Sequence, residues 1–230
     1  MEEGNISVNK KVKAVLLATI FLMTLPRLTI ASTEVTHDGL VLQADSKFGE
    51  VYLKPDSTLA GYNTYGLVSC QVAFRKNWMK NQNKHRTGLD RVTQKDIDRI
   101  KKTLSKECDR YFRAALEEDP AYPLIEEFND GDQVLVLRPA IINLDITAPD
   151  LRTPGMDRTY TTSAGQMTLY LEALDATTGE ILVRVIDRQK SMRAGVIRWT
   201  NSITNRAEAD RALKYWASLL RKGLDEVSGR

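Results

Sequence analysis

The sequence has few of the residues on which most enzymes depend. It contains two histidines, His37 and His85, which lie far apart and have no metal-ligating pattern around them. It has no P-loop and no G-x-G-x-x-G fingerprint, and no His, Cys, Asp and Glu group has the spacing of a metal site. The stretch TTSAG (161–165) lacks the first glycine of a G-x-S-x-G nucleophile elbow and precedes a predicted strand. The sequence therefore predicts no catalytic residue, no cofactor and no metal site.

The sequence also lacks an apolar run of the length that usually spans a membrane. Ala14–Leu25 has 12 residues before Pro26, whereas a spanning helix needs about 20. Three lysines precede this run, and Thr29 and Ala31 occupy the two positions that a signal peptidase reads. We therefore expect residues 1–31 to be a signal peptide and the protein to be exported to the periplasm or the envelope. An uncleaved N-terminal segment that anchors the protein in the inner membrane is the alternative.

A strong net charge is missing once this leader is set aside. The formal charge falls from +3 for the whole chain to +1 for residues 32–230. A near-neutral protein gives no general case for a nucleic-acid partner. We expect an N-terminal arm with short strands at 32–60 and a single domain at 61–230, because a chain of this length can bury one good core.

Cysteine is scarce, and the positions of the two cysteines are informative. In YGLVSCQVAF (65–74), Cys70 lies on the apolar face of a predicted strand. In the helix predicted to follow, Cys108 shares an apolar stripe with Ile97 and Leu104. Both thiols therefore point toward one strand–helix interface. A disulfide formed in an oxidising compartment and two separate buried thiols both fit this pattern.

Apolar periodicity predicts the fold class. Four long strands are expected at 65–74, 133–147, 166–176 and 181–190. The last three follow one another through hairpins, with TTGE (177–180) as a tight turn, and must be antiparallel. Each of the two long helices has a single apolar stripe. We therefore predict an α+β fold, a mainly antiparallel sheet with two long helices packed on one face, in the order β-α-β-β-β-α.

Three local signals set the expected element boundaries. Thr93 with Asp96 forms a capping box that starts the first long helix, and Asn205 with Glu208 does the same for the last one. Pro139 lies inside the second long strand. Because proline cannot donate to a ladder, we expect that strand to be an edge strand or to carry a bulge there.

The best candidate for an interaction surface in the sequence is the polar linker RKNWMKNQNKHR (75–86). It surrounds an aromatic residue with positive charge, and its candidate residues are Arg75, Lys76, Trp78, Lys80, Lys84 and Arg86. Such a cluster fits an anionic lipid surface or another polyanion. The favoured alternative is a solvated loop whose tryptophan folds back onto the core. The long loop at 148–165 is a second candidate.

The order of motifs resembles a known family. The motifs are DGLVLQ, VYLKPDSTLAGYNTYGLVSCQVAF, VLVLRPAIINLD, LEALDATTGEILVRVIDRQ and a late YWASLL. Together they resemble the bacterial domain-of-unknown-function family 3313, a group of exported envelope proteins. The resemblance implies an envelope location and a small α+β domain, and it implies no reaction. Many members look like lipoproteins, but here the first cysteine is Cys70, far beyond the leader.

These features favour a non-enzymatic exported accessory or binding protein of the envelope. Its partner would be an envelope protein or an anionic envelope surface, docked on an uncovered sheet face or edge. Val134 and Val136 point away from Leu135 and Leu137, which predicts that the second long strand is covered on both faces near its start. The alternative is an envelope hydrolase acting on peptidoglycan or lipid through carboxylates or Ser163.

Overall fold

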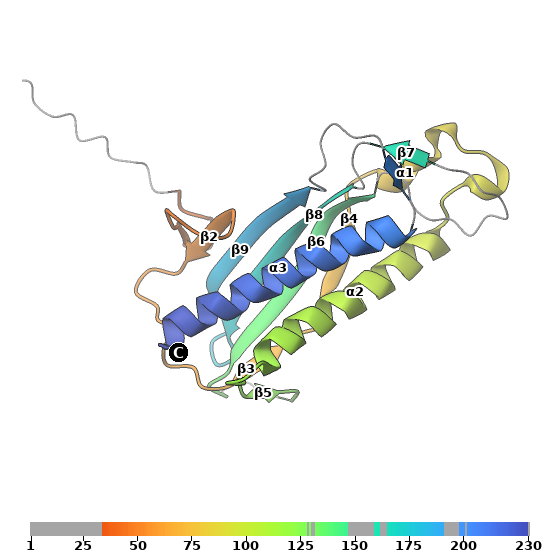
Figure 1. Cartoon of the computed structure of the whole chain (residues 1–230). Coiled ribbons are helices and arrows are strands. Elements are labelled where there is room, and N and C mark those ends of the chain that lie inside the picture. Colours follow the sequence, from red (N-terminus) through yellow and green to blue (C-terminus); the bar gives the residue numbers. More distant parts are fainter. Residues whose placement is uncertain are drawn as a thin grey trace, which may run out of the picture. The chain divides into compact units, whose positions relative to one another are not determined.

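Two long helices lie across one face of a sheet in the computed structural model (Figure 1). The structure describes residues 34–127, 129, 132–146, 159–161, 165–190, 198–200 and 202–229, which lie in one compact unit, Thr33–Arg230. The strands are β1 (Val41–Leu42), β2 (Glu50–Leu53), β3 (Tyr65–Leu67), β4 (Gln71–Phe74), β5 (Leu124–Ile125), β6 (Leu135–Ile146), β7 (Thr159–Thr161), β8 (Gly165–Asp175), β9 (Ile181–Lys190) and β10 (Arg198–Thr200). The helices are α1 (Trp78–Gln82), α2 (Gln94–Glu117) and α3 (Ser202–Ser228), with 3-10 turns η1 (Asn83–His85) and η2 (Gly88–Asp90).

The main sheet is mixed, which corrects the predicted, mainly antiparallel one. Its strand order is β1-β2-β9-β8-β6-β3-β5, with β4 also paired to β6, while β7 and β10 form a separate pair. The hairpin-linked strands β6, β8 and β9 are antiparallel, as predicted. However, β3 and β4 run parallel to β6. The chain passes from β4 through α2 before it returns as β6, and a crossover of this kind places its two strands parallel. The α+β class itself is confirmed.

Pro139 lies in the middle of the sheet, and its pairing with β8 is continuous, so the predicted edge strand and the predicted bulge at this position are both wrong. On one side of β6 it faces Leu171 of β8. On the other side, β3 ends opposite Leu137 and β4 begins opposite Ala140. Because proline has no N–H to donate, the neighbouring strand is interrupted where that donor is missing. The strand predicted at 65–74 is therefore divided into β3 and β4.

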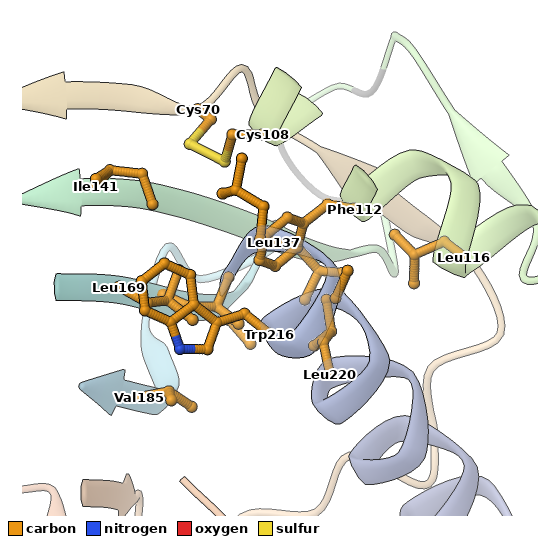
Figure 2. Close-up of a cluster of buried hydrophobic side chains, with 14 of the residues drawn as sticks. Cys70, Cys108, Phe112, Leu116, Leu137, Ile141, Leu169, Val185, Trp216 and Leu220 are labelled. Carbon is orange, nitrogen blue, oxygen red and sulfur yellow. A yellow bond between two sulfur atoms is a disulfide. The ribbon is translucent and has the colours of Figure 1, made fainter. Parts of the chain in front are cut away.

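The core fills the space between the sheet and the two helices. Trp216 of α3 lies beside Leu169 of β8, and Phe112 of α2 lies beside Leu137 of β6 (Figure 2). Trp216 is fully buried, and its Nε1 donates to Asp187 Oδ2 over 2.6 Å. The prediction of two long helices packed on one sheet face is thus confirmed for the described residues.

Of the two predicted capping boxes, the one at the start of α2 is present and the one at the start of α3 is not. Thr93 caps α2 by accepting from the Asp96 N–H, and Asp96 accepts from the Thr93 N–H, so the predicted capping box is present. In contrast, α3 begins at Ser202, and Asn205 lies inside the helix. The capping box predicted at Asn205 is therefore wrong, because the helical segment extends one turn further toward β10.

A disulfide joins the interrupted strand to α2. Cys70 and Cys108 are bonded, with their Cα atoms 6.1 Å apart, and both are buried in the core (Figure 2). Asp109 Oδ1 accepts from the Cys70 N–H over 2.7 Å, and Ser105 Oγ donates to the Cys70 carbonyl over 2.7 Å. The predicted meeting of the two cysteines is confirmed. These contacts also satisfy the backbone of the segment that lies between β3 and β4.

Candidate binding face of the sheet

The sheet face opposite the helices carries three rows of side chains, and we call this surface the helix-free face. Residues directly opposite each other on paired strands share a face, and the register therefore defines the rows. The first row is Arg138, Glu172, Arg184 and Tyr52, the second is Ala140, Tyr170, Ile186 and Glu50, and the third is Ile142, Thr168 and Arg188. Both long helices lie on the other side (Figure 1).

The first row is built around a buried ionic pair. Glu172 has a side chain only 5% exposed, and that of Arg184 is 9% exposed. Glu172 Oε1 accepts from Arg184 Nε at 2.9 Å and from the Tyr170 hydroxyl at 2.7 Å. Glu172 Oε2 accepts from Arg138 Nη2 at 2.5 Å. Both carboxylate oxygens therefore have donors, and the charge of Glu172 is neutralised within the face.

The N-terminal segment closes this row from the outside. Arg184 Nη1 and Nη2 donate to the two oxygens of Asp38 at 3.1 and 2.5 Å, a bidentate pair. Thr36 Oγ1 donates to Asp38 and accepts from the Leu40 N–H, which fixes the turn. Leu40 is buried. The segment that leads into β1 is therefore held on the sheet, and β1 and β2 extend the sheet beyond β9.

The acids of the row are held in their ionised forms. Burial alone would raise the pKa of Glu172, but hydrogen bonds from Arg138, Tyr170 and Arg184 outweigh it and hold that pKa below its usual value. The hydrogen bond from Arg184 holds the pKa of Asp38 well below its usual range. Burial, and then the hydrogen bond to Glu172, raises the pKa of Tyr170 to about 12. A carboxylate with a lowered pKa is a weak proton acceptor near neutral pH, so these groups act mainly as a fixed framework of charges.

The remaining rows offer a mixed, half-exposed surface. Tyr170, Ile142 and Ile186 are half-buried, while Arg138 has 47% of its side chain exposed. Arg188 is exposed, and its Nη2 donates at 2.5 Å to the side-chain oxygen of Gln166, a neutral group. An aromatic ring and aliphatic groups therefore lie between two exposed guanidinium groups, one of which, that of Arg188, forms no ion pair among the described residues.

The tryptophan of the predicted basic surface is not at the surface. Trp78 is 2% exposed. Its ring stacks on Phe74 with centroids 4.2 Å apart, and its Nε1 donates to the Ile146 carbonyl over 3.1 Å. Val92 and Ile97 complete this small second core. The ring itself is therefore unable to contact a ligand, as the alternative interpretation of this linker expected.

The basic residues of the same linker divide into two groups. Arg75 forms an ion pair with Asp145 at 2.9 Å, and Arg86 Nη1 donates to the Asp90 carbonyl at 3.3 Å. Lys76, Lys80 and Lys84 are exposed. An interaction surface built on these lysines stays a prediction, now without Trp78.

The structure also describes most of the other residues that the sequence analysis named. Val134 and Val136 are both buried, as the apolar pattern on both faces of β6 predicted. His37 and His85 are exposed and far apart in sequence. Most of the loop at 148–165, including Ser163, lies outside the described residues, as does the leader at 1–31.

Two searches of the described residues bear on metal binding and membrane insertion. They contain no group of three or more His, Cys, Asp or Glu side chains arranged to hold a metal ion. None of the helices in this part of the chain has the length and apolar content needed to cross a membrane.

Sequence reasoning missed the first row of the helix-free face, which we call the charged row, although a signal for it was present. Arg138, Glu172 and Arg184 each interrupt an apolar strand at a position whose neighbours face the core. A charge at such a position marks the outer face, but only the strand register shows that the three lie side by side. Asp38, which pairs with Arg184 of this row, comes from a segment about 100 residues or more away in sequence, which no local pattern reveals.

Comparisons with known proteins identify relatives for the chain. The family described as "Protein of unknown function (DUF3313)" matches residues 38–220. The comparison with curated proteins gave no match. Among solved structures, the chain is similar to the PelC dodecamer from Paraburkholderia phytofirmans, with TM-score 0.35 and 9% identity over 74% of this chain and 96% of PelC. It is also similar to a neuraminyllactose-binding hemagglutinin homolog from Helicobacter pylori, with TM-score 0.44 and 12% identity over 77% of this chain and 93% of that one.

Proposed function

The chain belongs to the DUF3313 family, and since that family's function is unknown, we propose a function from the surfaces of this molecule. We propose that it is a non-enzymatic, exported binding protein of the cell envelope. Its helix-free face docks on a protein partner that presents carboxylates and apolar side chains.

The observation that carries this proposal is the composition of the helix-free face. Arginine and tyrosine are enriched at protein interfaces and provide many of their strongest contacts. Here Arg138 and Arg188 flank the half-buried Tyr170, Ile142 and Ile186 on a surface formed by paired strands. A rigid sheet loses little conformational entropy when it binds, which favours docking.

Charge complementarity indicates what the partner presents. Arg188 is bonded to the neutral Gln166, and Arg138 shares Glu172 with the buried Arg184. Glu50, the exposed acid of the face, accepts from the Tyr52 hydroxyl. Neither exposed guanidinium group therefore has an unshared carboxylate partner among the described residues. A partner carboxylate would complete them with bidentate hydrogen bonds.

The arrangement of the acids favours binding over hydrolysis. A catalytic carboxylate needs a shifted pKa and access to substrate. Glu172 is the most buried acid of this face, both of its carboxylate oxygens accept hydrogen bonds, and its pKa is lowered. An acid in this state is a poor general acid or base near neutral pH. No observation in the described residues specifically favours the hydrolase alternative.

Export is supported by the leader pattern at 1–31 and by the disulfide between Cys70 and Cys108. The intact mass of protein expressed with its native N-terminus tests it. We expect a species that begins at Ser32 and is lighter than the reduced form by the two hydrogens lost in the disulfide. A full-length species in the membrane fraction would contradict export of a cleaved protein.

Site-specific photocrosslinking tests the docking face. A photoreactive residue replaces Glu50, an exposed position on the helix-free face. As a control, it replaces Lys222, an exposed position on α3. We expect one discrete crosslinked envelope protein from position 50 only. Ala140 is half-buried on the same face. The substitution Ala140→Glu places a negative charge there that repels partner carboxylates. It should abolish the crosslinked product without changing the melting temperature. Identical products from both positions, a crosslink to a second copy of the chain, or no effect of Ala140→Glu would overturn the docking proposal.

A further inference from the structure

The positive charge of the protein is concentrated in one short segment. Residues 75–106 contain eleven Lys and Arg side chains and three Asp, a formal charge of +8. The rest of the chain from Ser32 onward carries −7. A near-neutral total therefore conceals a strongly polarised molecule, and local potential matters more for association than net charge.

The first half of α2 presents this charge as a stripe. Lys95, Arg99, Lys102 and Lys106 are spaced by four, three and four residues, which places them on one side of the helix. The core-facing residues Ile97, Leu104 and Cys108 lie on the opposite side. The three lysines are exposed, and only Arg99, through Asp96, has an ion pair at this stripe.

The linker before α2 extends the stripe. We use the name basic ridge for its members together, namely Lys76, Lys80, Lys84, Arg91, Lys95, Arg99, Lys102 and Lys106. Figure 1 shows the linker, coloured yellow, next to the start of α2. The four linker residues of the ridge are exposed, and none of them forms an ion pair within the described part of the chain.

The linker is held in place by its own core, so the ridge is a built surface. Trp78, Val92 and Ile97 pack together and join the linker to the first turn of α2. Asn83 accepts from the Val92 N–H at 2.8 Å and donates to the Val92 carbonyl at 2.9 Å. The role of Trp78 is thus to fix the backbone that carries the surrounding lysines.

We propose that the basic ridge binds the surface of a bilayer containing anionic phospholipids. Lysine is a compact, strongly hydrated charge that suits a diffuse array of headgroups, and it is depleted from protein interfaces. Clusters of four to eight Lys and Arg side chains are typical of anionic-lipid recognition. Binding of single-stranded nucleic acid needs aromatic side chains on which bases stack, and the one tryptophan of the segment, Trp78, is buried. This site is separate from the helix-free face and does not depend on the function proposed for it.

Vesicle sedimentation with the full chain tests the proposal. Vesicles of phosphatidylcholine with about 30% phosphatidylglycerol are compared with pure phosphatidylcholine, which measures any insertion of the apolar leader independent of charge. We expect binding to depend on phosphatidylglycerol and to disappear in about 1 M NaCl, where the Debye length is about 3 Å.

A matched pair of triple variants separates the ridge from net charge. Lys95→Gln/Lys102→Gln/Lys106→Gln should weaken binding by about 100-fold, since each basic residue near the surface contributes about fivefold. The control Lys47→Gln/Lys214→Gln/Lys222→Gln removes the same charge from exposed positions outside the ridge, and we expect at most a few-fold change. Equal losses in both variants, no preference for phosphatidylglycerol, or tighter binding of a single-stranded oligonucleotide than of vesicles would overturn the proposal.

Discussion

At the residue scale, the buried Glu172 is the group on which the charged row depends. Burying a charge is tolerated only when partners replace its lost hydration, and here Arg138, Arg184 and Tyr170 do so. We predict that Glu172→Gln lowers the free energy of unfolding at neutral pH by about 3 kcal/mol, because it leaves the buried Arg184 with less compensation. Chemical denaturation measures this change. The matched control is Glu226→Gln at an exposed ion pair with Lys47, which should change stability by less than about 1 kcal/mol.

The same variant has a predicted pH dependence. The pKa of Glu172 is lowered by folding from an ordinary value of 4.5, so its contribution is complete above that value and is lost as the pH falls toward the native pKa. The stability difference between wild type and Glu172→Gln should therefore be constant near neutral pH and shrink as the pH falls below about 4.5. Urea titrations at several pH values provide the test. A difference that grows on acidification would contradict this role of Glu172.

Trp78 shows how far residue-scale reasoning from sequence extends. The pattern of lysines around a tryptophan was visible, but the pattern alone left the ring either exposed or folded onto the core. The choice depends on Phe74, Val92 and Ile146, which lie on three different segments. Long-range packing of this kind has no local signature in the sequence.

At the element scale, the disulfide and its neighbours stabilise the interrupted strand. The bond between Cys70 and Cys108 spans 38 residues, and loop-closure entropy for that length corresponds to about 4 kcal/mol. We predict that Cys70→Ala/Cys108→Ala lowers stability by up to this amount, measured by denaturation without reductant. Wild-type protein that is reduced in denaturant and then refolded should have the same free energy of unfolding as this variant. Equal stability of the variant and the oxidised wild type would show that the bond contributes nothing.

The start of α2 gives a second prediction at this scale. Thr93 accepts from the Asp96 N–H, and replacing such a cap by alanine costs about 1 kcal/mol. We expect this loss for Thr93→Ala. Thr103 is exposed within the same helix, and Thr103→Ala should instead stabilise slightly, since alanine has the higher helix propensity. The opposite signs of the two Thr→Ala changes, seen in thermal unfolding, distinguish capping from propensity.

Element type was more predictable than element pairing. The capping box at Thr93 and the hairpin at 177–180 are local features, and both are present. The parallel pairing of β3 and β4 with β6 was missed, because it depends on where the crossover through α2 returns. Pro139 was correctly identified as a missing donor, but the sequence did not show that the neighbouring strand, and not β6, would be interrupted.

At the scale of the whole molecule, the two proposed surfaces lie on opposite sides. The part of the basic ridge on α2 lies on the side of that helix away from the core, while the helix-free face lies beyond the sheet (Figure 1). A helix with its side chains is about 10–12 Å across, so a surface in contact with the ridge leaves the helix-free face in water. The arrangement would let one molecule hold a protein partner at a membrane surface.

This arrangement predicts an orientation on vesicles. Both native cysteines are buried in the disulfide, so a fluorophore can be attached selectively to Thr103→Cys on α2 or to Arg188→Cys on the helix-free face; both positions are exposed. On vesicles that contain phosphatidylglycerol, the probe on α2 should become shielded from an aqueous quencher, because the ridge contacts headgroups. The probe at position 188 should stay as accessible as it is in solution. Shielding at 188 without shielding at 103 would mean that the molecule binds through the other side, and equal shielding at both would mean insertion or aggregation instead of docking through the ridge.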